Sequence, residues 1–478
     1  MDKEQLHGYI SGNTEKKKMK YILNKDFRLR GWTDSIANLE YFPSRDLLEL
    51  TPKECLCLMK CDGEREMDPE AFQAELKKFL EAGVISETEG AKRLPEQEYL
   101  FYPNRKIRSM NIAITGSCDF RCRHCFNAAD DSPRGVTPKT EDLLRLIEEL
   151  SECGVANIWL NGGEPLLNKD FLKITKAIKD HGMIFSHLIS NTYHLTPEIV
   201  DELLRQGHKP MVYVSFDGVG SHEWLRQVPG SEQRTLERMA MLKEKGFYVL
   251  AHQCVWKDSL PNVWPTVYKL QELGVDKLRI TSVEPSVRWK EGTKDQTISY
   301  RAWLDFSVEF LRRWYQEKID MSLDIWGFWQ HSRGSDQVRI VPDIYQDHDK
   351  EYRIPSCSDG YNRPFIDCDG RIMICQGLSG ITKVYNMEWG NVYTDDLHEL
   401  LRDSRLMDSF KQTVGKMKDE QEACRDCEWR DHCNFGCRPE ALTQGNGLFG
   451  IDERMCIFYK EGYYDRYKEI MAEYGLKQ

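Results

Sequence analysis

The sequence predicts an α/β protein in three parts: a small N-terminal α+β module, a partial (β/α)6 barrel of the TIM type, and a cysteine-rich C-terminal domain. Between residues 108 and 285, apolar strand-like runs alternate with amphipathic helical segments. Repeated strand–helix units are typical of a parallel sheet covered by helices. Eight of the sixteen cysteines lie between Cys357 and Cys456, so we expect this region to fold around inorganic centres.

Shifts in composition divide the chain into five segments. The start is polar and lysine-rich, the middle is periodic, and an aromatic-rich stretch precedes the cysteine-dense end. Trp303, Phe306, Phe310 and Trp314 recur at helical spacing, which favours a core-facing helix over a cofactor contact. The predicted segments are a flexible tail (1–20), a winged-helix-like α+β module (21–102), the barrel (108–300), a helical bridge (301–356) and the cysteine-rich domain (357–478).

The N-terminal module has a clear helix-start signal. Thr51 fits the N-cap, Pro52 the first helical position and Glu54 the third, the pattern of a capping box. Asp62-Gly63 ends this helix, and a second helix is predicted over 69–82, ended by a glycine. The strand-like runs of the module are 21–29, 37–42 and 47–51.

The barrel is predicted from six apolar runs separated by helical segments. In parallel sheets of this kind, the chemistry lies at the carboxyl ends of the strands. Polar loops at those ends are therefore the candidate functional segments. The predicted strands are 110–115, 156–161, 184–190, 211–217, 247–254 and 277–282, and the predicted helices are 139–152, 168–181, 196–206, 232–245 and 262–273.

Charge and hydropathy exclude two classes of partner. The net charge of −11 argues against nucleic acid, which needs a basic surface. The mean hydropathy is −0.59, and no apolar run approaches the roughly 20 residues of a membrane helix. Met1-Asp-Lys-Glu-Gln5 lacks the apolar core of a signal peptide, so we expect a cytoplasmic protein with no membrane partner. Disulfides are rare in that compartment, which favours metal ligation by the cysteines.

Cys118, Cys122 and Cys125 follow the first barrel strand with the spacing C-x3-C-x2-C. Three thiolates on one short loop can hold three irons of a [4Fe–4S] cube and leave the fourth iron open. The alternative is a zinc site, which wants four ligands. His124 is the nearest fourth candidate, but its adjacency to Cys125 makes that chelate awkward.

Two further loops end the second and fourth strands. Asn161-Gly-Gly-Glu-Pro165 combines Gly162 and Gly163, which allow close backbone approach, with a carboxylate at Glu164. Val214-Ser-Phe-Asp-Gly218 offers Ser215 and Asp217 for ribose hydroxyls. Asn191 closes the third strand, and Arg226 follows the fourth. The alternative for each is an ordinary polar loop residue.

The motifs together resemble the radical S-adenosylmethionine (SAM) superfamily. The resemblance implies that Cys118, Cys122 and Cys125 hold the SAM-binding cluster. It also implies that Gly162, Gly163 and Glu164 hold the amino end of SAM and that Arg226 meets its carboxylate. The 5′-deoxyadenosyl radical made from SAM would then abstract hydrogen from an unactivated C–H bond.

The cysteine-rich end resembles the SPASM domain, a two-cluster extension of certain radical SAM enzymes. Its spacing includes C-x2-C-x5-C-x3-C, which on its own also fits a zinc ribbon. The resemblance implies two auxiliary clusters, three [4Fe–4S] clusters in all. Cys368 is either a fourth ligand of the inner cluster or a buried thiol. The implied ligands are Cys424, Cys427, Cys433 and Cys456 for the outer cluster, and Cys357, Cys375 and Cys437 for the inner one.

The N-terminal module resembles the PqqD-like elements that bind the leader of a ribosomally made precursor peptide. Such a peptide adds a strand to a sheet edge, and the expected edge is Asp46–Thr51, with the helix over 70–81 as the other wall. The alternative is a relic fold that binds nothing. Cys55, Cys57 and Cys61 are interpreted as core residues rather than ligands.

The family resemblance implies an oxidoreductase that modifies a precursor peptide, with a thioether or carbon–carbon crosslink as the expected product. An external one-electron donor such as flavodoxin or ferredoxin would supply the electron. One alternative is sulfatase-maturase-like oxidation of Cys or Ser, although Gln376 stands where that family has an aspartate. Another is a peptide epimerase with Cys254 as hydrogen donor. A non-catalytic electron carrier has no use for the two strand-end loops.

Overall fold

The computed structural model describes residues 19–125, 135–284, 287–293, 296–344, 351–382 and 384–478. It contains two compact units, Met1–Lys106 and Ile107–Gln478. Most of the tail predicted for residues 1–20 lies outside the described residues, and Met19 and Lys20 already belong to the first strand.

The first unit is an α+β module with two small sheets. One has the strand order β5-β1-β6 and the other β4-β3-β2-β7. The predicted capping box is confirmed, because Thr51 Oγ1 accepts from Glu54 N and the Glu54 carboxylate accepts from Thr51 N. The elements are β1 (Met19–Leu23), β2 (Phe27–Trp32), β3 (Ser35–Tyr41), β4 (Asp46–Glu49), α1 (Pro52–Lys60), β5 (Asp62–Met67), α2 (Gln73–Glu81), β6 (Ile85–Glu87) and β7 (Leu100–Tyr102).

The structure corrects three details of this module. The run 21–29 is two strands, because the chain turns where Phe27 N donates to Asn24 O. The second helix begins at Gln73 rather than at residue 69. Strand β5 was not predicted, since its exposed Glu-Arg-Glu segment lacks the apolar content of a strand. Cys55, Cys57 and Cys61 lie in the core of the module, as predicted.

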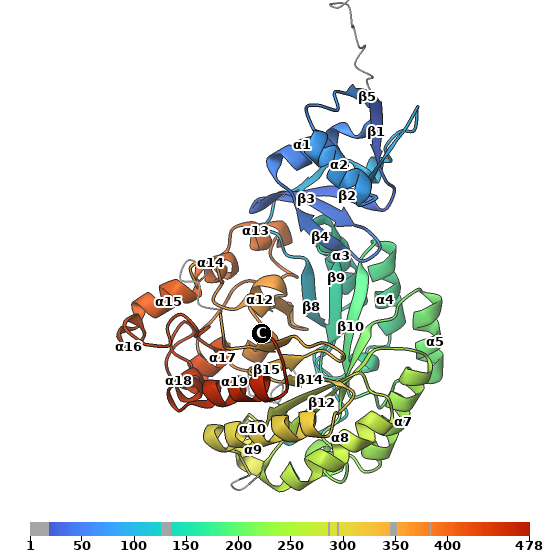
Figure 1. Ribbon diagram of the computed structural model, residues 1–478. Coiled ribbons are helices and arrows are strands. Elements are labelled where there is room, and N and C mark those ends of the chain that lie inside the picture. Colours follow the sequence, from blue (N-terminus) through green and yellow to red (C-terminus); the bar gives the residue numbers. More distant parts are fainter. Residues whose placement is uncertain (1–18, 126–134, 285–286, 294–295, 345–350, 383) are drawn as a thin grey trace, which may run out of the picture. The chain divides into compact units, whose positions relative to one another are not determined.

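The second unit is built on the predicted parallel sheet, and the fold class is confirmed. All six predicted strands and five predicted helices are present with small shifts at their ends, and the helices follow one another around the outside of the strands (Figure 1). The elements are β8 (Ser109–Ala113), α3 (Thr140–Glu152), β9 (Asn157–Asn161), α4 (Phe171–Asp180), β10 (Ile184–Ser190), α5 (Pro197–Arg205), β11 (Met211–Ser215), α6 (His222–Arg226), α7 (Ser231–Glu244), β12 (Val249–Val255), α8 (Val263–Glu272) and β13 (Lys277–Ser282).

The segment 301–356 is not the helical bridge that was predicted. Only its first part is a long helix, and the chain then adds a further parallel strand next to β13 and an antiparallel hairpin. The aromatic stripe of the helix packs into the barrel core, as expected. The short strands escaped detection because each has too few residues for a clear period. The elements are α9 (Val287–Gly292), α10 (Tyr300–Gln316), β14 (Ser322–Ile325), β15 (Trp329–His331) and β16 (Val338–Ile340).

The cysteine-rich end joins the same sheet. Strand β17 pairs in parallel with β8, with Phe365 opposite Asn111, so the sheet order is β16-β15-β14-β13-β12-β11-β10-β9-β8-β17-β18. This pairing places the segment between Cys357 and Cys375 beside the first barrel strand. The elements are α12 (Ser358–Asn362), β17 (Phe365–Ile366), β18 (Ile372–Met373), α13 (Leu397–Arg402), α14 (Arg405–Lys411), α15 (Val414–Glu420), α16 (Glu422–Arg425), α17 (Arg438–Thr443), α18 (Glu453–Lys460) and α19 (Tyr463–Glu473).

Among the helices of the described residues, none combines the length and the apolar character that crossing a membrane requires.

Candidate active site

The loop that carries the first three cysteines leaves the carboxyl end of β8. Burial raises the pKa of Cys118 to about 12, and the nearby Glu164, Cys122 and Cys125 also raise it. Three thiols in one another's field are costly to ionise unless a cation shares the site. Iron in a cluster supplies that cation and deprotonates its thiol ligands, so the donor set fits an iron–sulfur cluster.

Gly162 and Gly163 hold a second loop against the cysteine loop. Gly163 N donates to Thr115 O at 2.7 Å, and Glu164 N donates to Ser117 O at 2.8 Å. A Cβ on Gly162 would lie 2.2 Å from Thr115 O, and one on Gly163 would lie 2.3 Å from Ser117 O. These glycines therefore permit close approach of two protein loops, whereas the sequence suggested close approach to a ligand.

Glu164 is fully buried, and its carboxylate joins the loop after β9 to the end of β10. Its carboxylate accepts from Ser190 Oγ and from Asn191 N, both at 2.8 Å, and from Leu166 N at 3.2 Å. Burial raises the pKa of Glu164 to about 7, although these hydrogen bonds oppose the shift. A carboxylate has about four acceptor positions, so one position remains for an ammonium group such as that of SAM.

Asn191 carries a buried donor that needs a ligand. Its side chain is 6% exposed, and its Oδ1 accepts from Tyr193 N at 2.9 Å. Its Nδ2 has no hydrogen-bond partner among the described residues. An unsatisfied buried amide costs about 1–3 kcal/mol, and a bound polar cofactor at this strand end would remove that cost. The site therefore fits SAM beside the cysteine loop.

Asp217 and Arg226, which are predicted to bind different parts of SAM, form an ion pair with each other. Arg226 Nε lies 2.5 Å from Asp217 Oδ2 and Nη2 lies 3.2 Å from Oδ1, while Nη1 reaches Cys122 Sγ at 3.7 Å. Burial opposes ionisation of Asp217, but the guanidinium holds its pKa below the usual value. Asp217 is fully buried and also accepts from Cys254 N at 3.1 Å. Ser215 is half-buried at the end of β11.

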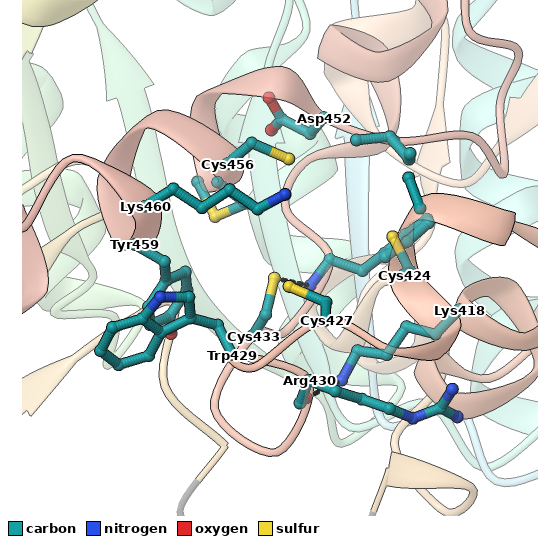
Figure 2. Close-up of a pocket in the computed structure, with 14 residues that line it drawn as sticks. Lys418, Cys424, Cys427, Trp429, Arg430, Cys433, Asp452, Cys456, Tyr459 and Lys460 are labelled. Atoms are coloured by element: carbon teal, nitrogen blue, oxygen red, sulfur yellow. Dashed lines mark hydrogen bonds between the residues drawn. The ribbon is translucent and has the colours of Figure 1, made fainter.

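The four thiols predicted for the outer cluster line a single cavity with about 50 Å³ of free volume. Figure 2 shows Cys424, Cys427, Cys433 and Cys456 around it. Burial raises the pKa of Cys433 to about 12, and Cys456 and Cys424 add to the shift, while Lys418 opposes it. Four cysteines around one space are the donor set of a closed iron–sulfur cluster.

A buried charge network next to this cavity escaped the sequence interpretation. Lys418 Nζ donates to Glu351 Oε2 at 2.9 Å and to Arg430 O at 2.5 Å. Arg430 reaches the other carboxylate oxygen of Glu351 at 2.7 Å. Lys418 and Glu351 are 67 residues apart, so no local pattern predicts their contact. The Lys418 ammonium lowers the pKa of Cys424 and Cys433 against the larger effect of burial, so it favours their thiolates.

The three thiols predicted for the inner cluster also lie close together. Burial raises the pKa of Cys375, and Cys357 is the next cause. Burial likewise raises the pKa of Cys437, and Cys375 is again the next cause. The three cysteines are half-buried, and Cys375 is the electrostatic neighbour of the other two, so the donor set fits a further iron–sulfur cluster with an open position.

Cys368 has different surroundings. It lies in the hydrophobic core of the unit and is almost fully buried. Burial raises the pKa of its thiol, and the carboxylates of Asp367 and Asp369 are the next causes. These surroundings favour the buried-thiol alternative, because neighbouring carboxylates oppose a further thiolate.

We expect Cys368→Ala to keep the iron content of the reconstituted protein and Cys437→Ala to lower it by about four irons per chain, the content of one cluster. Iron and acid-labile sulfide assays check this. Equal loss of iron in the two variants would instead identify Cys368 as a ligand.

Two family models match the chain. Residues 112–255 match the radical SAM superfamily, and residues 357–428 match SPASM, an iron–sulfur cluster-binding domain. Among curated proteins, the chain is 25% identical over 351 residues to an AdoMet-dependent heme synthase of Methanosarcina barkeri, covering 72% of this chain and 95% of the relative. It is 24% identical over 339 residues to a PqqA peptide cyclase of Bradyrhizobium diazoefficiens, covering 70% and 81%.

The fold is similar to those of two solved structures. Streptococcus suis SuiB bound to its precursor peptide SuiA has 14% identity and a TM-score of 0.64, covering 91% of this chain and 99% of that one. The anSMEcpe protein with bound AdoMet and a peptide has 16% identity and a TM-score of 0.57, covering 77% and 99%. At such identities the similarity establishes the fold.

Proposed function

We propose that this chain, a radical SAM enzyme with a C-terminal iron–sulfur cluster-binding SPASM domain, modifies a ribosomally made precursor peptide. Its cofactors are SAM and iron–sulfur clusters, and we propose three [4Fe–4S] clusters on the cysteine sets described above. Bound at the first set, SAM and its cluster supply a 5′-deoxyadenosyl radical that abstracts hydrogen. The expected product is a thioether or carbon–carbon crosslink.

The observation that carries the proposal is the exposed edge of the N-terminal unit. Strand β4 ends the order β4-β3-β2-β7 and is exposed along most of its length. An open edge offers backbone donors and acceptors to an incoming strand. The likeness to SuiB, a protein solved with its precursor peptide, extends over 91% of this chain, and the similar PqqA peptide cyclases also act on a peptide, as their name states.

The register of β4 identifies the groups that would bind a leader. Leu50 N donates to Ala37 O, and Leu48 lies opposite Leu39. Backbone groups alternate in direction along an antiparallel strand, so those of Leu47 and Glu49 point away from β3. These two residues are therefore the proposed hydrogen-bonding positions of the edge.

We expect Glu49→Pro to weaken leader binding by about 2- to 13-fold, because it removes one outward N–H and with it one backbone hydrogen bond worth about 0.5–1.5 kcal/mol. The β3–β4 ladder stays intact, since proline is tolerated where the N–H faces solvent. Fluorescence anisotropy of a labelled leader peptide measures the effect. Glu49→Ala keeps the N–H and is the control; equal binding by both variants would count against edge recognition.

The residues around the first cysteine set have distinct proposed roles toward SAM. Glu164 accepts from the ammonium group, and Asn191 Nδ2 donates to a polar group of SAM. Ser215 binds a ribose hydroxyl. Asp217 acts through Arg226, which it holds 3.7 Å from Cys122 Sγ, where the guanidinium balances the thiolate charge. These assignments follow from burial and from the unsatisfied donor of Asn191.

The test of function is co-expression with any small open reading frame that lies beside the gene, followed by mass spectrometry of the encoded peptide. A crosslink removes two hydrogen atoms, so we expect a mass loss of two hydrogens that depends on Cys118, Cys122 and Cys125. An unmodified mass together with unchanged residue configuration would refute the proposal for that peptide. A ferredoxin or flavodoxin is the proposed electron donor.

Other reactions are less well supported by the site. Sulfatase-maturase-like oxidation would need a base after Cys375, and Gln376 instead lies 3.4 Å from Asn161 Nδ2. Epimerisation is favoured by one observation: burial raises the pKa of Cys254, so its thiol keeps the hydrogen that it would donate. Epimerisation leaves the peptide mass unchanged.

The heme synthase relatives suggest a different substrate class, a tetrapyrrole. A tetrapyrrole has no backbone that could pair with the exposed edge of β4, so this substrate leaves the edge without a use.

A further inference from the structure

The two faces of the barrel strands differ in exposure. On the outward face, Ile158, Val214 and Ile280 belong to the hydrophobic core and are fully buried. Successive side chains of a strand point to opposite faces, so the alternate positions line the barrel interior. A closed barrel fills its interior with packed side chains, whereas this partial barrel keeps many interior positions partly exposed. They include Trp159, His187, Ser215, His252 and Arg279.

Arg279, on β13, is held in place on this inward face by the protein itself. Its Nε and Nη2 donate to Asp324 Oδ2 at 2.9 and 2.7 Å, and Asp324 is fully buried. The guanidinium carbon lies 5.3 Å from the ring centre of Tyr213 and 4.5 Å from that of Trp326. A guanidinium fixed in this way loses little conformational freedom when it binds a ligand.

One edge of the fixed guanidinium is free. Arg279 Nη1 has no hydrogen-bond partner among the described residues, and 16% of the side chain is exposed. Asp324 Oδ1 is buried and also has no partner in the described part of the chain. Buried polar groups are rarely left unsatisfied in a complete site. A ligand with an acceptor for Arg279 and a donor for Asp324 would satisfy both.

The charges of this cluster do not cancel. Lys277 Nζ lies 3.6 Å from the Asp324 oxygen that Arg279 also contacts, so two cations share one carboxylate. The field at the neighbouring His187 is positive as well, since burial and then Arg363 and Arg279 lower the pKa of His187 to about 3. A concave, partly buried surface with excess positive charge attracts anions, so the ligand of Arg279 is expected to be anionic.

Strand register places Arg279 near the residues proposed to bind SAM. Arg279 lies opposite His252 on β12, and His252 lies opposite Ser215 on β11. Neighbouring strands are about 4.8 Å apart, so about 10 Å separates the backbones at Arg279 and Ser215. Two residues beyond His252, the N–H of Cys254 donates to Asp217 beside the first cysteine set. A group bound by Arg279 therefore lies close to the proposed SAM site.

We propose that Arg279 binds a carboxylate of the precursor peptide and thereby selects the segment that reaches SAM; this rests on the proposed function. The carboxylate is either the side chain of an Asp or Glu or the C-terminus of the peptide. Arg279 Nη1 donates to one of its oxygens, and a backbone N–H of the same peptide donates to Asp324 Oδ1. Arg279 is thus a specificity-determining residue and takes no part in the making or breaking of bonds.

The first experiment varies the peptide and leaves the enzyme unchanged. The wild-type holoenzyme is given the peptide that it modifies, with each Asp or Glu replaced in turn by Asn or Gln, and a further version with a C-terminal amide. One of these changes should raise the KM for the peptide by about 10- to 150-fold, the loss expected for one charged hydrogen bond. The change that does so identifies the carboxylate as a side chain or as the C-terminus.

The second experiment varies the enzyme. Arg279→Gln should raise the KM for the unchanged peptide by a similar factor, and the sensitive peptide change should then have no further effect, as for two groups in contact. Formation of 5′-deoxyadenosine without peptide should stay within about twofold of the wild type, because only peptide binding is lost. Arg333→Gln, at an exposed ion pair with Asp320, is the charge-matched control.

Arg279→Lys guards against a folding defect in Arg279→Gln, because lysine keeps a cation beside the buried Asp324. It lacks the second edge of a guanidinium, so the KM for the peptide should still rise by about 3- to 10-fold. The peptide series on the wild type also remains informative if neither variant folds.

Two outcomes would overturn the assignment. If no carboxylate change in the peptide raises its KM, or if the effect persists undiminished in Arg279→Gln or Arg279→Lys, Arg279 binds no peptide carboxylate. If Arg279→Lys loses SAM cleavage in the absence of peptide, the guanidinium serves SAM or the fold instead. A failure of the proposed function would appear in the wild type, which would then modify no peptide, whereas a failure of this assignment appears with a wild type that does.

Discussion

Replacing Cys118, Cys122 or Cys125 with alanine is expected to abolish reductive SAM cleavage. Each of the three thiols is a ligand of the proposed [4Fe–4S] cluster. A variant with only two of them leaves a second iron of that cluster without a protein ligand. Glu164 and Asn191 would remain in place, because they are anchored by strand ends β9 and β10 rather than by the thiols. The formation of 5′-deoxyadenosine after dithionite reduction measures the effect, and we expect the level of a protein-free reaction.

The iron content separates a local effect from unfolding. Each of these variants should keep the iron of the C-terminal sets, since those cysteines line separate sites. Cys153→Ala is the matched control, because Cys153 is a buried thiol beside His398 Nδ1 at 3.3 Å and belongs to none of the cysteine sets. Normal SAM cleavage by Cys122→Ala would refute the assignment of the first cysteine set.

Gly163→Ala is expected to lower SAM cleavage by about 10²-fold, although alanine adds only a methyl group. The new Cβ would lie 2.3 Å from Ser117 O and 2.8 Å from Gly116 O, and these backbone atoms directly precede Cys118. The cysteine loop must therefore move, and a shift of about 1 Å in a catalytic group commonly costs that much. Overpacking of this kind also destabilises by about 1–3 kcal/mol.

Gly90→Ala is the control for this prediction, because a Cβ there meets no atom within 4 Å. The KM for SAM and the rate of 5′-deoxyadenosine formation should be measured for both variants, together with the thermal midpoint. If Gly163→Ala cleaves SAM like the wild type, the close contact between the two loops does not position the cluster.

Residue types and their spacing over a few positions predict much of the fold and the grouping of the cysteines. The capping box at Thr51 and Glu54 begins α1 where predicted, since its hydrogen bonds join residues three apart. The barrel strands were predictable because each is a short segment rich in apolar and β-branched residues between two helical segments. Cys424 and Cys427, which have two residues between them, line the same cavity, as their spacing implies.

Contacts between distant residues were not predictable in this way. Asp217 and Arg226 are each predicted to contact SAM, and the turn after β11 also brings them into an ion pair with each other, which no spacing rule indicates. Strands β14 to β16 extend a segment that was predicted to be a helical bridge, because pairing with β13, not their own sequence period, makes them strands.

Spacing along the chain predicts the succession of strands and helices between residues 108 and 285, the three cysteines after the first barrel strand and the grouping of the C-terminal cysteines. Three other features follow only from the folded chain. Lys418 neutralises Glu351 beside the outer set, Cys368 lies in the core, and Glu284 contacts Arg454, which is 170 residues away in the sequence. These contacts depend on how buried charge is compensated in three dimensions, and sequence spacing carries no information about that.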